Sequence, residues 1–289
     1  MTAPGAATDP TRVLVTGVRG KTGAPLAQLL AARPGVQVLG GSSDPATVTA
    51  EGVRPTAFSW DDPAGWPAAV EGIDAVYVVR PDRPDAPELI AALLDQVPHR
   101  AHVVLLSEQS AGDVDPQGWA VRAEQVVHDS GHSWTVLRPS WFMQVFTDPR
   151  FYLDLLISGG DLPFPDGGAH IAWIDARDIA AVAERALLEP GHAGLRYELT
   201  GPEALTLPRT AELLSRATGR PVVHQDVTVE EAVAGTAGFD RELLALTYHR
   251  VRGGSFATVT GTVEQVTGRP ARTLGAFLDD IGPALRPAA

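Results

Sequence analysis

The segment VTGVRGKTG, residues 15–23, decides how the first half of the chain folds. It follows an apolar, β-branched run and precedes a stretch of helical composition at 24–32. Its glycines follow the spacing Gly-x-x-Gly-x-x-Gly. Gly17 permits a tight turn, Gly20 lets the backbone approach a pyrophosphate, and Gly23 lets the helix pack closely on the strand. A strand before the glycines and a helix after them together predict a dinucleotide-binding turn.

Short apolar runs alternate with helical stretches through the first 140 residues. Strands are expected at 12–16, 36–39, 54–58, 75–79, 102–106 and 134–137, with a helix at 119–129 between the last two. Such alternation is typical of βαβ units and of a parallel sheet covered on both faces. Because the crossovers are right-handed, the sequence predicts an α/β protein with a Rossmann-like doubly wound parallel sheet.

The second half of the chain has a different pattern. Asp175 can cap a helix, with Asp178 three residues on in capping-box register and an apolar stripe after it. Further elements are expected as a strand at 195–200, a strand at 222–225, and helices at 208–218, 229–237, 241–252, 259–267 and 274–281. We therefore expect a disordered tail at 1–11, an NAD(P)-binding domain at 12–200 and a small, mostly helical substrate lobe at 201–289.

The composition excludes several classes of protein. The 289 residues carry 23 Lys and Arg against 35 Asp and Glu, a net charge of −12, which disfavours a nucleic-acid partner. No apolar run approaches the roughly 20 residues of a membrane span, and the N-terminus lacks a signal-peptide pattern, so a cytoplasmic protein is expected. The absence of cysteine excludes thiolate chemistry. His128 and His132 stand at a helix end without a third ligand, so no metal site is predicted.

The choice between nicotinamide cofactors depends on charge near the second expected strand. An NAD site places a carboxylate at the end of this strand, but here no carboxylate occurs before Asp44. Arg19 and Lys21 in the turn could pair with a 2′-phosphate, and Ser42 and Ser43 could donate hydrogen bonds to it. NADP(H) is therefore favoured, while NADH remains the alternative if Asp44 reaches the ribose.

The chain has a single lysine, Lys21, and this limits its chemistry. Short-chain dehydrogenases pair a tyrosine with a lysine four residues later, and the lysine lowers the tyrosine pKa for proton transfer. Here the positions four after the tyrosines hold Pro81, Leu156, Gly201 and Arg252. Arginine stays charged and cannot pass a proton. The usual acid for alcohol and ketone chemistry is therefore absent.

Several later motifs carry a family resemblance. They are VEGIDAVYVVRP at 70–81, LLS at 105–107, WTVLRPSWFMQ at 134–144, the segment 175–180 and YELTGP at 197–202. With the glycine turn, the chain resembles the NmrA-like atypical short-chain dehydrogenase/reductases from about residue 12 to 281. The resemblance and the turn together imply a cofactor site formed by Gly17, Arg19, Gly20, Lys21, Thr22, Gly23, Ser42, Ser43, Trp60, Val79, Arg80, Pro81, Ser107, Pro139, Ser140 and Trp141.

Within that family the motifs look most similar to the ergot-alkaloid branch of festuclavine/agroclavine dehydrogenase-like proteins. The similar segments are GKT at 20–22, FSWDD at 58–62 and SWFM at 140–143. These relatives reduce a cyclic iminium with NADPH in secondary metabolism, and an iminium accepts hydride without a general acid. Other relatives reduce quinones, azo dyes or triphenylmethane dyes. Ser59 and Val145 depart from the family pattern, near the expected adenine contact and nicotinamide packing respectively.

Substrate and catalytic groups are expected between the sheet edge and the second lobe. An apolar wall there would suit a small apolar or polycyclic substrate, and its candidates are Trp119, Phe142, Met143, Phe164 and Trp173. The weak candidates for catalysis are Ser107, Glu108, Arg122 and His170, with Glu124 also near this edge. None of them belongs to a recognisable catalytic motif.

These observations predict an NADPH-dependent reductase that transfers hydride to an electrophilic iminium, C=C or quinone-like substrate. Two alternatives remain open. One is a non-catalytic regulatory protein that senses NADP(H), as some relatives do. The other is an isomerase or cyclase that uses the same fold without net redox chemistry.

Overall fold

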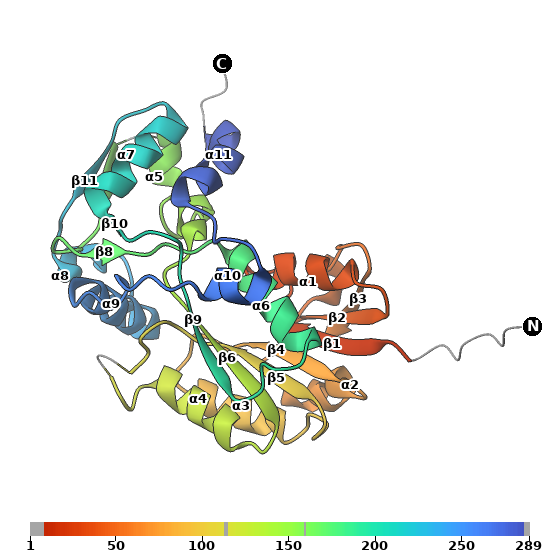
Figure 1. The fold of residues 1–289 in the computed structure, drawn as a ribbon. Coiled ribbons are helices and arrows are strands. Elements are labelled where there is room, and N and C mark those ends of the chain that lie inside the picture. Colours follow the sequence, from red (N-terminus) through yellow and green to blue (C-terminus); the bar gives the residue numbers. More distant parts are fainter. Residues whose placement is uncertain (1–8, 113–114, 159, 286–289) are drawn as a thin grey trace, which may run out of the picture.

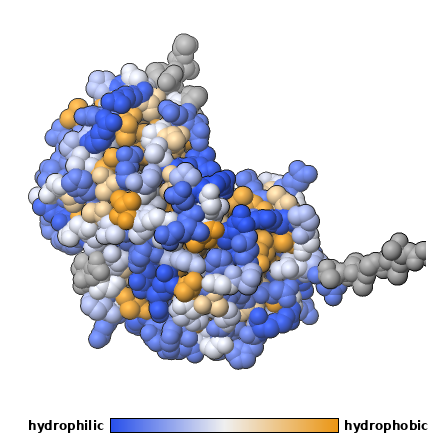
Figure 2. Space-filling model, in the orientation of Figure 1, coloured by the Kyte–Doolittle hydropathy of each residue, from blue (hydrophilic) through white to orange (hydrophobic). Residues whose placement is uncertain are grey.

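The computed structural model describes residues 9–112, 115–158 and 160–285, and most of the expected tail at 1–11 therefore lies outside the described residues. The chain forms a large sheet with helices on both faces and a second lobe beside it (Figure 1). Hydrophilic residues dominate the visible face, with apolar residues in scattered patches (Figure 2). Among the residues described, no helix has the length and apolar character needed to cross a bilayer.

The central sheet confirms the predicted doubly wound α/β architecture. Its seven strands lie in the order β3-β2-β1-β4-β5-β6-β9, and all neighbours pair in parallel. The order reverses between β1 and β4, which is where ligands bind in such sheets, beyond the carboxyl ends of the strands. The strands are β1 (Thr11–Thr16), β2 (Val36–Ser42), β3 (Val53–Ala57), β4 (Ala75–Val79), β5 (His102–Leu106), β6 (Ser133–Pro139) and β9 (Leu195–Leu199).

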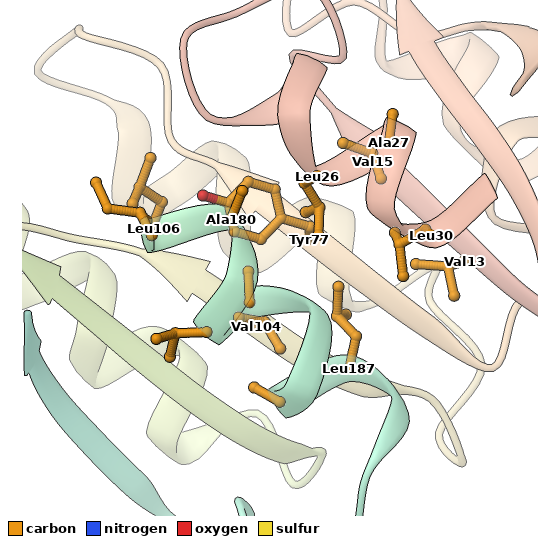
Figure 3. Packing of buried hydrophobic residues seen from close by; sticks show 14 of the residues in the cluster. Val13, Val15, Leu26, Ala27, Leu30, Tyr77, Val104, Leu106, Ala180 and Leu187 are labelled. Carbon is orange, nitrogen blue, oxygen red and sulfur yellow. The ribbon is translucent and has the colours of Figure 1, made fainter. Parts of the chain in front are cut away.

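The central strands β4 and β5 are almost continuous apolar runs, because each of their faces meets a separate layer of helices. Along β1, Val13 and Val15 belong to one core cluster and Leu14 to another, as the two-residue repeat of a strand requires. In the first cluster, Val15 packs with Leu26 of the helix that follows the glycine turn (Figure 3). Burying each such side chain contributes roughly 1.5–3 kcal/mol.

Two helical layers cover the sheet. One face packs against α1 (Gly23–Ala31), α6 (Ala176–Leu188) and α10 (Thr262–Thr267). The other carries α2 (Trp66–Val70), α3 (Ala86–Leu94) and α4 (Trp119–Asp129). Asp175 caps α6 by accepting from the Arg177 amide at 2.8 Å, as predicted. Asp178 does not complete a capping box, because its carboxylate pairs instead with Arg272.

The second lobe has its own apolar core, which includes Met143, Phe164 and Trp173 together with residues between 205 and 278. Its strand β11 was predicted, but the short strands β7, β8 and β10 were not. The expected boundary at residue 200 stays a proposal. The elements here are η3 (Met143–Thr147), α5 (Leu153–Ser158), β7 (Gly160–Pro163), β8 (His170–Ile171), β10 (Leu205–Thr206), α7 (Leu207–Thr218), β11 (Val222–Gln225), α8 (Val229–Ala232), α9 (Gly238–Arg252) and α11 (Leu274–Leu285).

Candidate functional site

The glycine turn joins β1 to α1 in a conformation that its residues require. Gly17 has φ of +66°, which a side chain would strain. A Cβ on Gly23 would lie 2.3 Å from the carbonyl oxygen of Gly17, so only glycine permits this approach of helix and strand. At the start of α1, Thr22 makes no side-chain capping bond and the first turn holds no acidic residue. The first turn of α1 therefore places amide N–H groups and the positive end of the helix dipole next to the glycine turn.

A polar link fixes the turn to the next strand of the sheet. The Thr16 hydroxyl donates to the carbonyl oxygen of Tyr77 at 3.0 Å and accepts from the amide of Val79 at 2.8 Å. These bonds tie the ends of β1 and β4 together at the point where the strand order reverses. The ends of β1 and β4 are therefore held at a fixed separation, at the edge where a dinucleotide is expected.

Two adjoining cavities open along this edge. The first, of about 400 Å³, is bordered by the glycine turn, the ends of β4, β5 and β6, and α9. The second, of about 480 Å³, is bordered by the glycine turn and by the ends of β2, β3 and β4. They share Gly17, Gly20, Val79, Arg80 and Asp82, so they form one trough across the strand ends.

The second cavity has the character of an adenosine site. Trp60 lines it and is held edge-on against Phe58 and Trp66 at ring-centroid distances of 5.2 and 5.8 Å. Arg19, Ser42, Ser43, Ser59 and Pro81 lie on the same border. Asp44 does not, because its carboxylate accepts from the Ala46 amide and caps a short 3₁₀ helix (Pro45–Thr47).

Lys21 and Arg19 belong to opposite ends of the trough. Lys21 borders the first cavity only, where its ammonium pairs with Asp148, a residue that also binds Arg150. Arg19 borders the second cavity only. The structure therefore places the two cations on different cavities, and their role at a 2′-phosphate stays a prediction. Ser43 borders the second cavity with Arg19, while the Ser42 hydroxyl already bonds to the carbonyl of Asp44.

A charged cluster crosses the first cavity between the sheet and the second lobe. Glu108, just after β5, accepts from Arg80 at 2.7 Å and from Arg250 of α9 at 2.8 Å. The guanidinium of Arg80 also lies 4.0 Å from the ring of Trp119. Burial by itself would raise the pKa of Glu108, but the two arginines outweigh it and hold that pKa below its usual value. Glu108 is therefore ionised near neutral pH and has no proton to donate.

Ser107 is held by a second ion pair, whose carboxylate is buried. Its hydroxyl donates to Glu124 at 2.5 Å, and Arg138 binds the same carboxylate through Nη2 at 2.6 Å. Arg80 approaches the Ser107 hydroxyl at 3.4 Å. Ser107 borders the first cavity while Glu124 lies behind it, so Glu124 orients Ser107 rather than facing a ligand.

Trp141 forms the wall between the cleft and the second core. It borders the cavity together with Phe142 and Phe256. Its ring contacts Phe164 and Trp173 at centroid distances of 5.2 and 6.0 Å, and these two are fully buried behind it. Of the five expected wall residues, Phe142 alone borders the cavity; Met143, Phe164 and Trp173 lie in the second core, and Trp119 contacts Arg80 and Phe239.

Some of the remaining predicted residues border the first cavity, and others lie away from both cavities. Thr22, Pro139 and Ser140 border the first cavity, and the buried Ser140 hydroxyl has no hydrogen-bond partner among the described residues. Two catalytic candidates lie elsewhere: Arg122 is exposed on α4 and pairs with Glu88, and His170 is exposed on β8. Neither borders the two cavities.

Several cavity residues carried no sequence signal. They are Asp82 just after β4, Arg150 and Phe151 after η3, and Leu243, Thr247, Arg250 and Phe256 of the second lobe. No motif contains them, and they reach the cleft through tertiary packing alone. The one available hint was helical spacing, since Leu243, Thr247 and Arg250 follow at intervals of four and three residues.

Comparison with known proteins shows the family to which the chain belongs. The sequence profile of the NAD(P)H-binding family matches residues 17–190. The chain is 34% identical to an NAD(P)H azoreductase from Xenophilus azovorans, over 92% of this chain and 96% of that protein. It is 35% identical to a (4-alkanoyl-5-oxo-2,5-dihydrofuran-3-yl)methyl phosphate reductase from Streptomyces griseus, over 90% and 94% of the two chains.

Two further similarities bear on the fold and on the expected branch. The structure of Citrobacter sp. triphenylmethane reductase with NADP(H) superposes with a TM-score of 0.79 at 20% identity, covering 93% of this chain and 99% of that one, which establishes the shared fold. Agroclavine dehydrogenase from Claviceps fusiformis is 30% identical, over 93% and 96% of the two chains. Because the azoreductase and the phosphate reductase are both more similar, the short motifs do not single out the ergot-alkaloid branch.

Proposed function

The chain belongs to the NAD(P)H-binding family, among the NmrA-like atypical short-chain dehydrogenase/reductases, and from this we propose that it is an NADPH-dependent reductase of an electrophilic small molecule. The acceptor would contain an azo, quinone-like, C=C or iminium group. The observation that carries the proposal is the trough that runs from the adenosine-like cavity to an aromatic-walled cavity beyond the glycine turn. The relatives named as reductases support the reaction type.

The residues present fit a dinucleotide. The tight spacing among Gly17, Gly20 and Gly23 leaves the backbone bare where a pyrophosphate would lie, next to the uncapped start of α1. Trp60 offers a ring surface for the adenine. Ser140 contributes a buried hydroxyl that needs a partner, at the end of the trough where Trp141 also lies. When bound, the nicotinamide supplies a hydride.

The protein would orient the acceptor, exclude water from it and place a fixed charge beside it, but it would not supply an acid. Glu108 is ionised and the Ser107 hydroxyl donates to Glu124, so neither group is suited to protonate a product. Trp141, Phe142 and Phe256 exclude water from the acceptor. Arg80 is a fixed positive charge near the cavity and would stabilise negative charge that develops on an acceptor atom. Acceptors that need no enzyme acid therefore fit the site best.

Turnover with a panel of acceptors tests the proposal. We expect the purified protein to oxidise NADPH in the presence of quinone, azo or cyclic iminium compounds, followed as loss of absorbance at the reduced nicotinamide band. An NADP(H) sensor predicts NADPH binding without oxidation by any acceptor. An isomerase or cyclase predicts product formation while the NADPH concentration stays constant.

Arg19 is proposed to set the preference for NADPH over NADH. Its position on the border of the adenosine-like cavity, without an Asp44 carboxylate beside it, suits a 2′-phosphate. Asp61 also borders the cavity, but Arg83 binds its carboxylate at 2.6 Å. Arg19→Ala should raise the Kd for NADPH by roughly tenfold, the loss of one charge-assisted contact, and leave the Kd for NADH nearly unchanged.

Titration of both cofactors by fluorescence gives this comparison. Arg54→Ala is the matched control, because Arg54 is an exposed arginine on β3 that does not border the trough. Lys21→Ala, on the first cavity, should affect the two cofactors equally. An equal loss for NADPH and NADH in Arg19→Ala would refute the assignment of the 2′-phosphate to Arg19.

A further inference from the structure

We propose that the acceptor is an aromatic compound carrying an acidic group, with its ring on Phe151 and its negative charge on Arg150. This inference rests on the proposed reductase function and names the substrate class of the same cleft. Both residues lie in the segment between η3 and α5, and both border the first cavity. Neither is part of the glycine turn or of a strand end, where the cofactor contacts are expected.

Phe151 is an exposed aromatic surface on the border of the cavity. Its residue is 40% exposed, whereas the next residue, Tyr152, is buried in the second core. The other large exposed hydrophobic residues of the described chain are aliphatic (Ile157, Leu195, Val223 and Val259) and none borders either cavity. Covering an exposed ring with a flat aromatic ligand is favourable, by about 0.5–1.5 kcal/mol for ring contact beyond burial of area. The position of Phe151 on the cavity border makes the acceptor the natural partner of its ring.

The charge beside Phe151 is positive. Asp148 pairs with both Arg150 and Lys21, and these hydrogen-bonded cations hold the pKa of Asp148 well below its usual range. The charged residues that border the first cavity are four cations (Lys21, Arg80, Arg150 and Arg250) and two carboxylates (Asp82 and Glu108), and with Asp148 their formal charges sum to plus one. Lys21 also lies 5.6 Å from the ring of Phe151, so ring and charge form one surface.

Arg150 has a donor left over on the border of the cavity. Its Nε and Nη2 donate to Asp148 at 3.1 and 2.7 Å, while Nη1 donates to no residue in the described part of the chain. Its side chain is 75% exposed, so an anion can reach it. The chain as a whole carries a net charge of −12, which repels anions at long range. An acidic acceptor would therefore need a local positive surface of this kind to enter.

The cofactor phosphates are the competing partner for Arg150. They are expected on the glycine turn and at the start of α1, where backbone N–H groups and Lys21 are available. Arg150 comes instead from the segment that leads into the second lobe, next to Phe151. Cofactor affinity in the variants separates the two roles.

The experiment compares an azo dye that carries an aryl carboxylate with the methyl ester of the same dye. The steady-state KM for each dye is measured with NADPH, and the Kd for each is measured on the protein saturated with NADP⁺, where no hydride transfer occurs. We expect Arg150→Gln to raise KM and Kd for the carboxylate about fivefold, the upper range for a solvent-accessible ion pair. The same change should leave the ester and the Kd for NADPH within about twofold.

Two further variants complete the design. Phe151→Leu keeps an apolar side chain without the ring, and it should weaken both dyes about equally. Arg209→Gln is the matched control, because Arg209 is an exposed arginine that is also paired with a carboxylate, Glu212, on the remote helix α7. It should change none of these values. Added salt should raise the KM of the carboxylate dye and not that of the ester.

The possible results separate the preference for an acidic aromatic acceptor from the proposed reductase function. Equal affinity of the unmodified protein for the two dyes overturns the inference, as does failure of both dyes to bind. A loss of NADPH affinity in Arg150→Gln as large as the loss for the dye assigns Arg150 to the cofactor and also overturns it. If the carboxylate binds better, and Arg150→Gln removes the difference, but neither dye nor any other acceptor oxidises NADPH, the reductase function fails while the anion preference stands.

Discussion

Replacing Gly20 with aspartate should abolish NADPH binding while the protein remains folded. A Cβ at this position would lie 3.1 Å from the carbonyl oxygen of Gly17, a close contact that the turn must accommodate. The larger effect is electrostatic, because the carboxylate would face the expected pyrophosphate. Two unit charges about 4 Å apart repel by roughly 4 kcal/mol at an effective dielectric constant of 20. We therefore expect the Kd to rise at least about a hundredfold.

Gly20→Ala separates the steric part of this effect from the charge. It adds the same Cβ without the carboxylate, so its loss of affinity should be much smaller, about tenfold or less. Gly235→Asp controls for a new acidic residue, since Gly235 has open space around it. Cofactor titration and thermal unfolding of the three variants form the measurement. Unchanged NADPH affinity in Gly20→Asp would refute the cofactor assignment of the trough.

The glycine turn and the strand ends that border the trough were predictable because local sequence encodes them. The spacing of Gly17, Gly20 and Gly23 encodes the turn, since Gly17 has a positive φ, Gly23 has no room for a Cβ and Gly20 has little. The apolar runs encode the strands, and a parallel order then brings their carboxyl ends together. Residues at those ends, such as Ser107 and Pro139, consequently lie on one cavity.

The acceptor end could not be predicted in the same way. Arg150, Phe151 and Arg250 are placed by packing between segments more than 90 residues apart, as the bond between Arg250 and Glu108 illustrates. Sequence also could not distinguish Trp141, which borders the cleft, from Trp173, which lies behind it. Both are aromatic residues in apolar surroundings, and only the fold decides which face of the wall each occupies. The pairing of Lys21 with Asp148 could not be predicted either, because Asp148 is remote in sequence.

Removing Arg138 should be among the most destabilising changes outside the apolar core. Glu124 is only 3% exposed, and Arg138 binds both of its carboxylate oxygens, with Nε at 2.9 Å from Oε1 and Nη2 at 2.6 Å from Oε2. Arg138→Met leaves Glu124 with the Ser107 hydroxyl and with Arg196, whose Nε lies 3.6 Å away. An uncompensated buried charge typically costs 3–5 kcal/mol. With Arg196 as partial compensation, we expect a loss of about 3 kcal/mol in the free energy of unfolding.

The double variant shows whether the buried charge is the cause. Glu124→Gln keeps an acceptor for Ser107 but removes the charge, so Arg138→Met with Glu124→Gln should recover most of the lost stability. The deficit of Arg138→Met alone should also shrink as the pH falls. Its stranded carboxyl would have a raised pKa in the folded state, so the folded protein binds the proton more tightly and gains stability on acidification. Denaturant unfolding of the unmodified protein, the two single variants and the double variant between pH 5 and 8 measures both effects. If the losses in free energy of unfolding are additive and independent of pH, Arg138 contributes packing and does not act by neutralising Glu124.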